Sequence, residues 1–223
     1  MRASIAWLCS CLLLSGTRPA AGTDFDVVFE IPLRVHLLRS QTLSEVGSTL
    51  TTADVERILG KVNTIWGAAG IRFRADRIVE EPPARPAPAG PTQPDNLWKL
   101  IPPASFNPEA FNLYYIRRMN TNGIMVAYGK LPAVFVKDTS ALRQVPGGID
   151  EPIPRVTSHE LGHALGLSHR EAVFNLMASG TTATALSSSE RLQARLNAST
   201  VPWIRRVQAP DTPRPRQEPG LAR

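Results

Sequence analysis

Residues 159 to 169 read His159-Glu160-Leu161-Gly162-His163-Ala164-Leu165-Gly166-Leu167-Ser168-His169, and this stretch contains three of the four histidines in the chain. His159 and His163 are four residues apart, so on a helix they project from the same face, about one turn from each other. Two imidazoles placed in this way can bind one zinc ion. Pro154 suits the first turn of such a helix. The spacing therefore predicts a helix that carries two metal ligands.

Gly166 allows a third ligand to come from the same stretch. Glycine tolerates a positive φ, so the helix can end there and the chain can turn back toward the metal with His169. Three protein ligands leave a fourth position for water, which is typical of a catalytic rather than a structural zinc site. Glu160 lies beside His159 and can reach the open side of the metal without being a ligand, where it can take a proton from that water.

The alternative interpretation is a packed helix whose histidines belong to the core, and it leaves the clustering of three histidines in eleven residues unexplained. His36 is different, because it stands alone in a predicted strand. We expect His36 to be structural rather than a metal ligand.

The stretch resembles the long zinc-binding motif of the metzincin clan of zinc endopeptidases, whose second element is a downstream methionine turn. Asn175-Leu176-Met177-Ala178-Ser179 lies where that turn is expected. The resemblance implies that Met177 forms the hydrophobic floor beneath the three imidazoles. Ser179 stands where astacins and serralysins carry a tyrosine ligand, so the chain is more similar to the small secreted bacterial enzymes of matrixin or reprolysin type.

This resemblance implies an α+β, metzincin-like zincin fold. In that fold a twisted, mixed five-stranded sheet with two long helices precedes a small, irregular C-terminal lobe with a terminal helix. The sequence itself predicts elements in a compatible order. They are a strand over 31–37, a helix that a Thr51–Asp54 capping box begins, a strand over 71–79, a Pro-rich loop over 81–96, strands over 111–116, 124–128 and 133–136, the zinc helix, and a last helix that Ser187 and Glu190 begin, with Leu192 and Leu196 facing inward. In the first of these helices one helical stripe is apolar: Val55, Ile58, Leu59, Val62, Ile65 and Trp66.

Residues 1–22 are typical of a signal peptide. Arg2 precedes an apolar stretch over 5–14, and Ala20-Ala21-Gly22 offers a cleavage site. The apolar stretch has about half of the roughly 20 residues that a membrane span needs. We therefore expect a secreted or periplasmic protein without a membrane span. A buried N-terminal helix and a lipid anchor on Cys9 or Cys11 are the alternatives.

The rest of the chain is expected to form a peptidase domain over 23–208, with an N-terminal lobe to about 166, a C-terminal lobe over 167–208 and a disordered Pro/Arg-rich tail over 209–223. The whole chain has 223 residues, is 43% hydrophobic and carries a net charge of +6. Removal of 1–22 would take away both cysteines and lower the charge to +4, because Arg2 and Arg18 leave with it. A charge of +4 spread along the chain argues against a nucleic-acid partner.

The resemblance also implies that the fourth strand is an antiparallel edge, which lines the cleft and pairs with an extended substrate. The matching run makes Ile124, Met125, Val126 and Ala127 candidate substrate-binding residues. An ordinary edge strand is the alternative interpretation.

We thus predict a zinc metalloendopeptidase that binds one catalytic Zn²⁺ through His159, His163 and His169 and hydrolyses peptide bonds in proteins or peptides, with Glu160 activating the water at the metal. The alternative is a metzincin-fold module that binds zinc and a protein partner with little or no peptidase activity. Neither a calcium site nor an oligomeric state is predicted.

Overall fold

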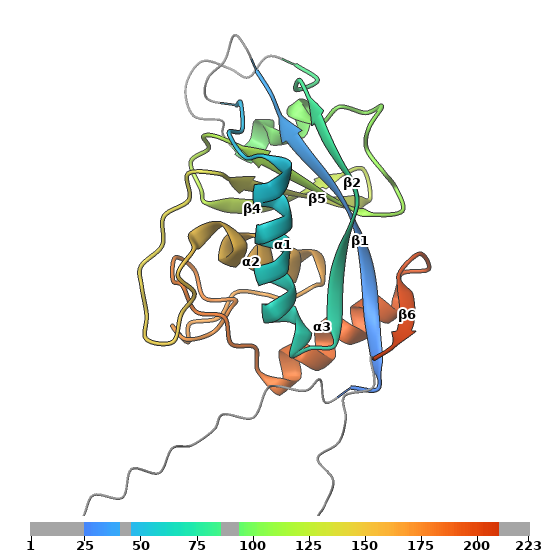
Figure 1. The fold of residues 1–223 in the computed structure, drawn as a ribbon, viewed down its shortest axis with the longest axis vertical. Helices are drawn as coiled ribbons and strands as arrows, with labels where there is room; N and C mark the ends of the chain where they lie inside the picture. Colours follow the sequence, from blue (N-terminus) through green and yellow to red (C-terminus); the bar gives the residue numbers. More distant parts are fainter. Residues whose placement is uncertain (1–24, 41–45, 86–93, 210–223) are drawn as a thin grey trace, which may run out of the picture.

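The structure is a computed structural model that describes residues 25–40, 46–85 and 94–209. A mixed β-sheet lies at its centre (Figure 1). The elements are β1 (Val27–Leu38), α1 (Thr52–Gly67), β2 (Ile71–Glu81), the 3-10 helix η1 (Pro94–Leu100), β3 (Phe111–Ile116), β4 (Gly123–Tyr128), β5 (Leu131–Lys137), α2 (Pro152–Ala164), α3 (Ser188–Thr200) and β6 (Arg205–Gln208). The predicted signal peptide over 1–22 and the predicted tail from 210 onward lie outside the described residues.

The sheet follows the path β2-β1-β3-β5-β4, with β4 as an antiparallel strand at the edge of an otherwise parallel path. The prediction of five strands is one strand short, because β6 also pairs with β1, antiparallel over Val27–Glu30. β3 pairs with β1 only from Leu33 onward, so the same edge of β1 is free before that residue and accepts β6. The class, a mixed α+β fold with three α-helices, agrees with the prediction.

α1 covers one face of the sheet, and its start confirms the predicted capping box. The Thr51 side chain accepts a hydrogen bond from the Asp54 backbone N–H, and the Asp54 carboxylate accepts one from the Thr51 backbone N–H. These bonds satisfy donors that a helix start leaves without partners. The buried face of α1 is the predicted one: Val55, Ile58, Leu59, Val62, Ile65 and Trp66.

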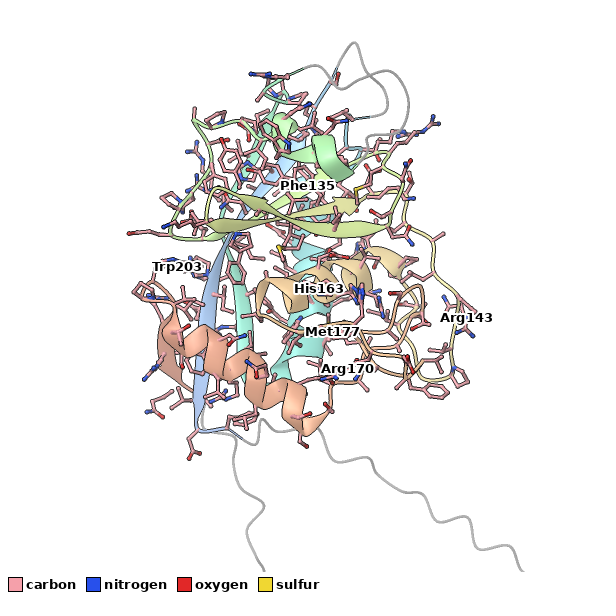
Figure 2. All side chains as sticks on the ribbon, turned by 180° about the vertical axis from the view of Figure 1, so that it is seen from behind. Phe135, Arg143, His163, Arg170, Met177 and Trp203 are labelled. Atoms are coloured by element: carbon pink, nitrogen blue, oxygen red, sulfur yellow. The ribbon has the colours of Figure 1, made fainter. Side chains whose placement is uncertain are left out.

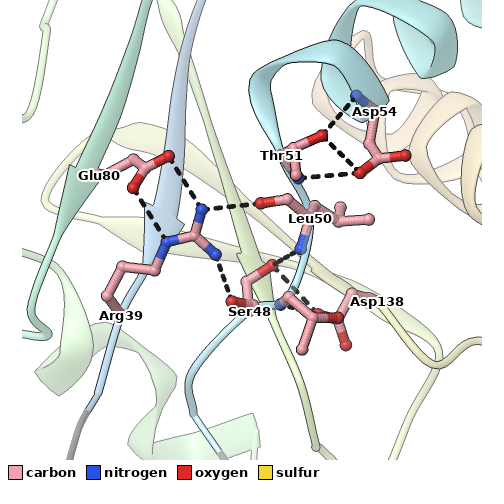
Figure 3. A network of polar contacts seen from close by, with 8 residues as sticks. Arg39, Ser48, Leu50, Thr51, Asp54, Glu80 and Asp138 are labelled. Carbon is pink, nitrogen blue, oxygen red and sulfur yellow. Dashed lines mark hydrogen bonds and ion pairs between the residues drawn. The ribbon is translucent and has the colours of Figure 1, made fainter.

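Figure 3 shows how the segment before α1 is attached to the ends of the strands. The Arg39 guanidinium, at the end of β1, pairs with Glu80 of β2 and donates hydrogen bonds to the backbone carbonyls of Ser48 and Leu50. Asp138, just after β5, accepts hydrogen bonds from the Ser48 hydroxyl and from the backbone N–H of Thr49. The start of α1 is therefore fixed relative to three strands.

The sheet has a hydrophobic core on each face. Ile31, Leu33, Val35 and Leu37 of β1 contribute to the larger core, together with residues of α1, α2 and α3. The smaller core lies on the opposite face, where Leu97 and Leu100 of η1 pack on the sheet. η1 begins at Pro94, so the end of the predicted loop over 81–96 is helical.

The buried face of α3 differs from the predicted one. Its capping box between Ser187 and Glu190 is present, but Leu192 and Leu196 are exposed, at 59% and 53%. The inward face consists of Glu190, Ala194 and Ala198. Small side chains allow the helix to lie close to the turns beneath it, where Arg195 donates to the carbonyls of Ala69 and Gly70 and Asn197 donates to that of Leu165. None of the helices in the described residues is long and apolar enough to cross a membrane.

Candidate metal centre

The three histidines of the motif meet at one point of the structure. His159 and His163 come from α2, and His169 comes from the irregular segment that follows it. Their Nε2 atoms form a triangle with sides of 3.1, 3.2 and 3.2 Å. Three nitrogen ligands at 2.0–2.1 Å from a tetrahedral zinc ion would be about 3.3–3.4 Å apart. The triangle is therefore close to the dimensions that zinc coordination requires.

Hydrogen bonds at the other ring nitrogens determine which atoms point to the centre. His159 Nδ1 donates to the Leu176 carbonyl and His163 Nδ1 donates to the Leu167 carbonyl, each at 2.8 Å. Burial lowers the pKa of His159 to about 3 and also lowers the pKa of His163, so both rings are neutral at pH 7. A neutral ring that donates through Nδ1 presents a lone pair at Nε2. Lone pairs at such distances repel one another unless a cation lies between them, so the donor set fits a divalent metal such as zinc.

The end of α2 brings His169 back to the other two ligands. Gly166 has a φ of 79°, a conformation that favours glycine. Its backbone N–H donates to the His163 carbonyl, and the Leu167 N–H donates to the Gly162 carbonyl, both at 2.9 Å. These two bonds form a Schellman motif, which ends the helix and reverses the chain.

Met177 lies beneath this part of α2, below His163 in the view of Figure 2. Its side chain is fully buried and touches the helix at Gly162, where a Cβ atom would lie 2.7 Å from the methionine sulfur. Asn175 shapes the turn, because its side-chain oxygen accepts the Met177 N–H at 2.6 Å while its amide donates to Glu190. The methionine thus packs directly against the helical turn between the two histidines.

Sequence reasoning missed Arg155, which is 2% exposed and lies one helical turn before His159. Its guanidinium donates to the backbone carbonyls of Ala183, Leu176 and Ala178. The Leu176 carbonyl is also the acceptor for His159, so Arg155 holds the group that orients a ligand. Burial lowers the pKa of Arg155 to about 10, so it remains charged at neutral pH. An arginine within a buried helical face was the available sequence signal.

Glu160 is the acidic side chain at this centre. It is 6% exposed, and burial raises its pKa to about 8, against the opposing effects of the Arg155 charge and of a hydrogen bond from the Met125 backbone. Gly123 allows β4 to approach it, because a Cβ atom there would lie 2.6 Å from Glu160 Cγ. A divalent cation at the histidines would lower this pKa. The carboxyl can therefore gain or lose a proton near neutral pH.

A cavity of about 240 Å³ lies beside the histidine triangle, with His159, His169, Glu160 and Arg155 in its wall. The remaining lining residues are Thr121, Asn122, Gly123, Leu142, Val156, Ser179 and Gly180. A second cavity, of about 360 Å³, lies between α1, β2 and β6, and Arg72 is the only charged residue that lines it. The acid–base groups thus belong to the smaller cavity.

The candidate substrate-binding residues are on β4, the strand at the edge of the sheet next to α2. Ile124 and Val126 pack against the smaller core on the opposite face of the sheet, whereas Met125 packs against the larger core. None of the run Ile124–Ala127 lines the cavity, which begins at Gly123. This run can therefore bind an extended peptide through its backbone N–H and C=O groups.

No protein-family model matches the chain, and no curated protein matches it significantly. An archaemetzincin from Methanopyrus kandleri superposes with a TM-score of 0.52 at 13% identity, over 76% of this chain and 96% of that one. A zinc-dependent peptidase from Methanocorpusculum labreanum gives a TM-score of 0.44 at 12% identity (73% and 99% of the two chains). Metalloproteinase-II from Bacteroides fragilis gives 0.48 at 14% identity (80% and 55%). The fold is thus similar to that of an archaemetzincin, and a matrixin or reprolysin subtype stays a prediction.

Proposed function

We propose that the chain is a zinc-dependent endopeptidase of metzincin type, in which His159, His163 and His169 bind one zinc ion and Glu160 is the general base. The observation that carries the proposal is the convergence of three Nε2 atoms within 3.1–3.2 Å of one another, at a cavity that a buried carboxyl also lines. The similarity of the fold to that of an archaemetzincin supports it.

Zinc at such a site supplies Lewis-acid catalysis, toward water and toward the carbonyl of a peptide bond. Glu160 accepts a proton from the attacking water and then gives it to the amine that leaves when the C–N bond breaks. Burial raises the pKa of Glu160 and a bound divalent cation would lower it, and these opposing effects suit a group that must be a base first and an acid afterwards. The Met125 backbone holds the Glu160 carboxyl, and burial excludes bulk water from it.

Residues Ile124–Ala127 bind the substrate backbone in this proposal. β4 pairs with β5 through one of its edges, and the described residues place no strand on its other edge. An extended peptide added there would gain main-chain hydrogen bonds. Because Ile124 and Val126 face the opposite core, selection among side chains depends on the cavity rather than on these two residues.

Residues 1–22 direct export in this proposal, so the enzyme acts outside the cytoplasm. The support is the charged, apolar and small-residue pattern of that stretch. N-terminal sequencing of the protein recovered from the periplasm or the medium tests this. An intact Met1 in the recovered protein would contradict it.

The central experiment combines metal analysis with cleavage of casein. The purified wild type, Glu160→Gln and the matched control Glu109→Gln, whose glutamate is exposed and does not line the cavity, are each assayed with and without a chelator. We expect one zinc ion per chain in all three proteins. Cleavage should be chelator-sensitive in the wild type and the control, and should fall at least 100-fold in Glu160→Gln. Full activity in Glu160→Gln would refute the role of this residue.

Absence of zinc from the wild type would refute the metal centre itself. Stoichiometric zinc without cleavage of any unstructured protein would instead favour a zinc-containing module that binds a partner.

A further inference from the structure

Arg155 is a buried cation whose charge no acidic side chain balances directly. No carboxylate of the described residues forms an ion pair with it. Its hydrogen bonds all go to backbone carbonyls, those of Ala183, Leu176 and Ala178. Glu160 acts on Arg155 through its charge but forms no ion pair with it. Burying a charge without a paired opposite charge costs free energy, so an anion that reached this group would be bound favourably.

Two N–H groups of the guanidinium have no acceptor among the described residues. Of its five N–H groups, the one on Nε and the two on Nη2 bind the three carbonyls, and the two on Nη1 have no acceptor among the described residues. Nη1 lacks a hydrogen-bond partner but is not fully enclosed, so part of its surface is accessible to solvent. Since Arg155 lines the cavity beside His159 and Glu160 and is otherwise buried, that contact is with the cavity.

The cavity suits a short side chain with a charged end. Its volume of about 240 Å³ is several times the roughly 30 Å³ that a water molecule occupies in the liquid. Thr121, Asn122 and Ser179 contribute neutral polar groups, and Leu142 and Val156 contribute apolar surface. Glu160 is the only acidic residue that lines it. With a divalent metal bound, Arg155 and the metal together would outweigh the charge of Glu160, so the site would still attract an anion.

We infer that Arg155 makes this cavity a subsite for an acidic side chain, aspartate or glutamate, next to the peptide bond that is cleaved. The inference rests on the proposed peptidase function and adds the substrate class. Nη1 donates to one carboxylate oxygen, while the hydroxyls of Thr121 and Ser179 are available to the other. The Asn122 amide is held by the Ala141 backbone and shapes the wall.

The test compares two peptide hydroxamates that differ only in an aspartyl or an asparaginyl residue beside the hydroxamate group, measured on the zinc-loaded full chain by calorimetry. The pair is made twice, with the hydroxamate on either side of that residue, because one of the two places the side chain in the cavity. Both compounds share the chelating group, so the ratio of their dissociation constants isolates the carboxylate. We expect the aspartyl compound of one pair to bind at least tenfold more tightly.

Two variants assign the effect. In Arg155→Gln the ratio should fall to about one. Arg143→Gln should keep it, because it removes an exposed arginine (labelled in Figure 2) that follows Leu142 of the cavity wall but does not itself line the cavity. If Arg155→Gln does not fold, Arg155→Lys replaces it and should lower the ratio, because lysine lacks the planar set of donors.

Equal affinities in both wild-type pairs would overturn the inference and leave the proposed function standing. A preference that survives in Arg155→Gln would also overturn it. A protein that binds no zinc and neither compound would overturn the proposed function, and the inference with it.

Discussion

The molecule has two clusters built around histidine, one buried at His36 and one that reaches the surface at His169, and they use the imidazole ring in opposite ways. In the first, His36 of β1 stacks on Tyr114, and its two ring nitrogens lie 2.6 Å from a Glu81 carboxylate oxygen and 3.2 Å from Asn112 Oδ1. The Asn112 amide nitrogen donates to the carbonyls of Asn107 and Ala110, so its oxygen faces the ring. Every polar atom of His36 therefore has a partner within the protein.

In the second cluster each histidine of α2 has a partner at Nδ1 only. His159 and His163 donate to backbone carbonyls, and their Nε2 atoms face each other and His169. Burial lowers the pKa of His36 and of His159, so burial does not distinguish the two clusters. The difference lies in the unused nitrogen: a histidine is available to a metal when the fold occupies one ring nitrogen and leaves the other free.

Removal of one histidine ligand tests most directly whether the second cluster binds a metal. His163→Ala is expected to lower the affinity for zinc at least 100-fold, because two imidazoles remain of three, and to abolish casein cleavage. Zinc content after dialysis against a weak chelator measures the effect. Wild-type zinc affinity in the variant would show that His163 is not a ligand.

The pH dependence of the free energy of unfolding tests how burial affects Glu160 in the metal-free protein. Because the folded-state pKa is raised to about 8, the folded protein binds a proton there that the unfolded chain releases near pH 4.5. This group therefore stabilises the fold fully below about pH 4.5, and its contribution falls as the pH rises to about 8. Denaturant unfolding at pH 6.5 and 8.5 should show a loss of about 2 kcal/mol in the metal-free wild type.

Glu160→Gln is the control for this loss, because glutamine does not titrate. Its unfolding free energy should change less over the same interval. The same loss in both proteins would assign the pH dependence to another group.

The smallest expected effect concerns His36. His36→Phe keeps an aromatic ring against Tyr114 but removes the hydrogen bonds of both ring nitrogens. Glu81 keeps the Ser105 hydroxyl and Asn112 keeps the Asn107 N–H as donors, so the free energy of unfolding should fall by about 1–3 kcal/mol. Zinc content should stay at one ion per chain, and casein cleavage should be retained. Loss of zinc from this variant would mean that the two clusters are coupled.

Predictions from the sequence succeeded where a local rule decides the outcome. The capping boxes at Thr51 and Ser187 were identified from residues three apart, and the apolar face of α1 was identified from its helical period. The same reasoning failed on α3, where Leu192 and Leu196 are exposed. That helix docks through Ala194 and Ala198 on turns far away in sequence, and a rule that places the larger apolar side chain inward cannot detect this.

β6 could not be anticipated either, since it pairs with β1 across about 175 residues and depends on where β3 begins its own pairing. Gly123 and Arg155 were missed for a similar reason. The close approach of Gly123 to Glu160, and of Arg155 to the carbonyl of Ala183, exists only after β4 and the segment 170–186 have packed on α2.

The sequence alone determined the set of candidate ligands, because four-residue spacing on a helix and a glycine at its end are local geometry, independent of the rest of the chain. Only the tertiary structure decided what those residues can do. The carbonyl of Leu176, from a distant turn, sets which nitrogen of His159 is free. The packing of β4 on α2 buries Glu160 and raises its pKa. Both effects depend on the distance between groups from separate elements, and a pKa or a tautomer follows from such distances rather than from sequence spacing.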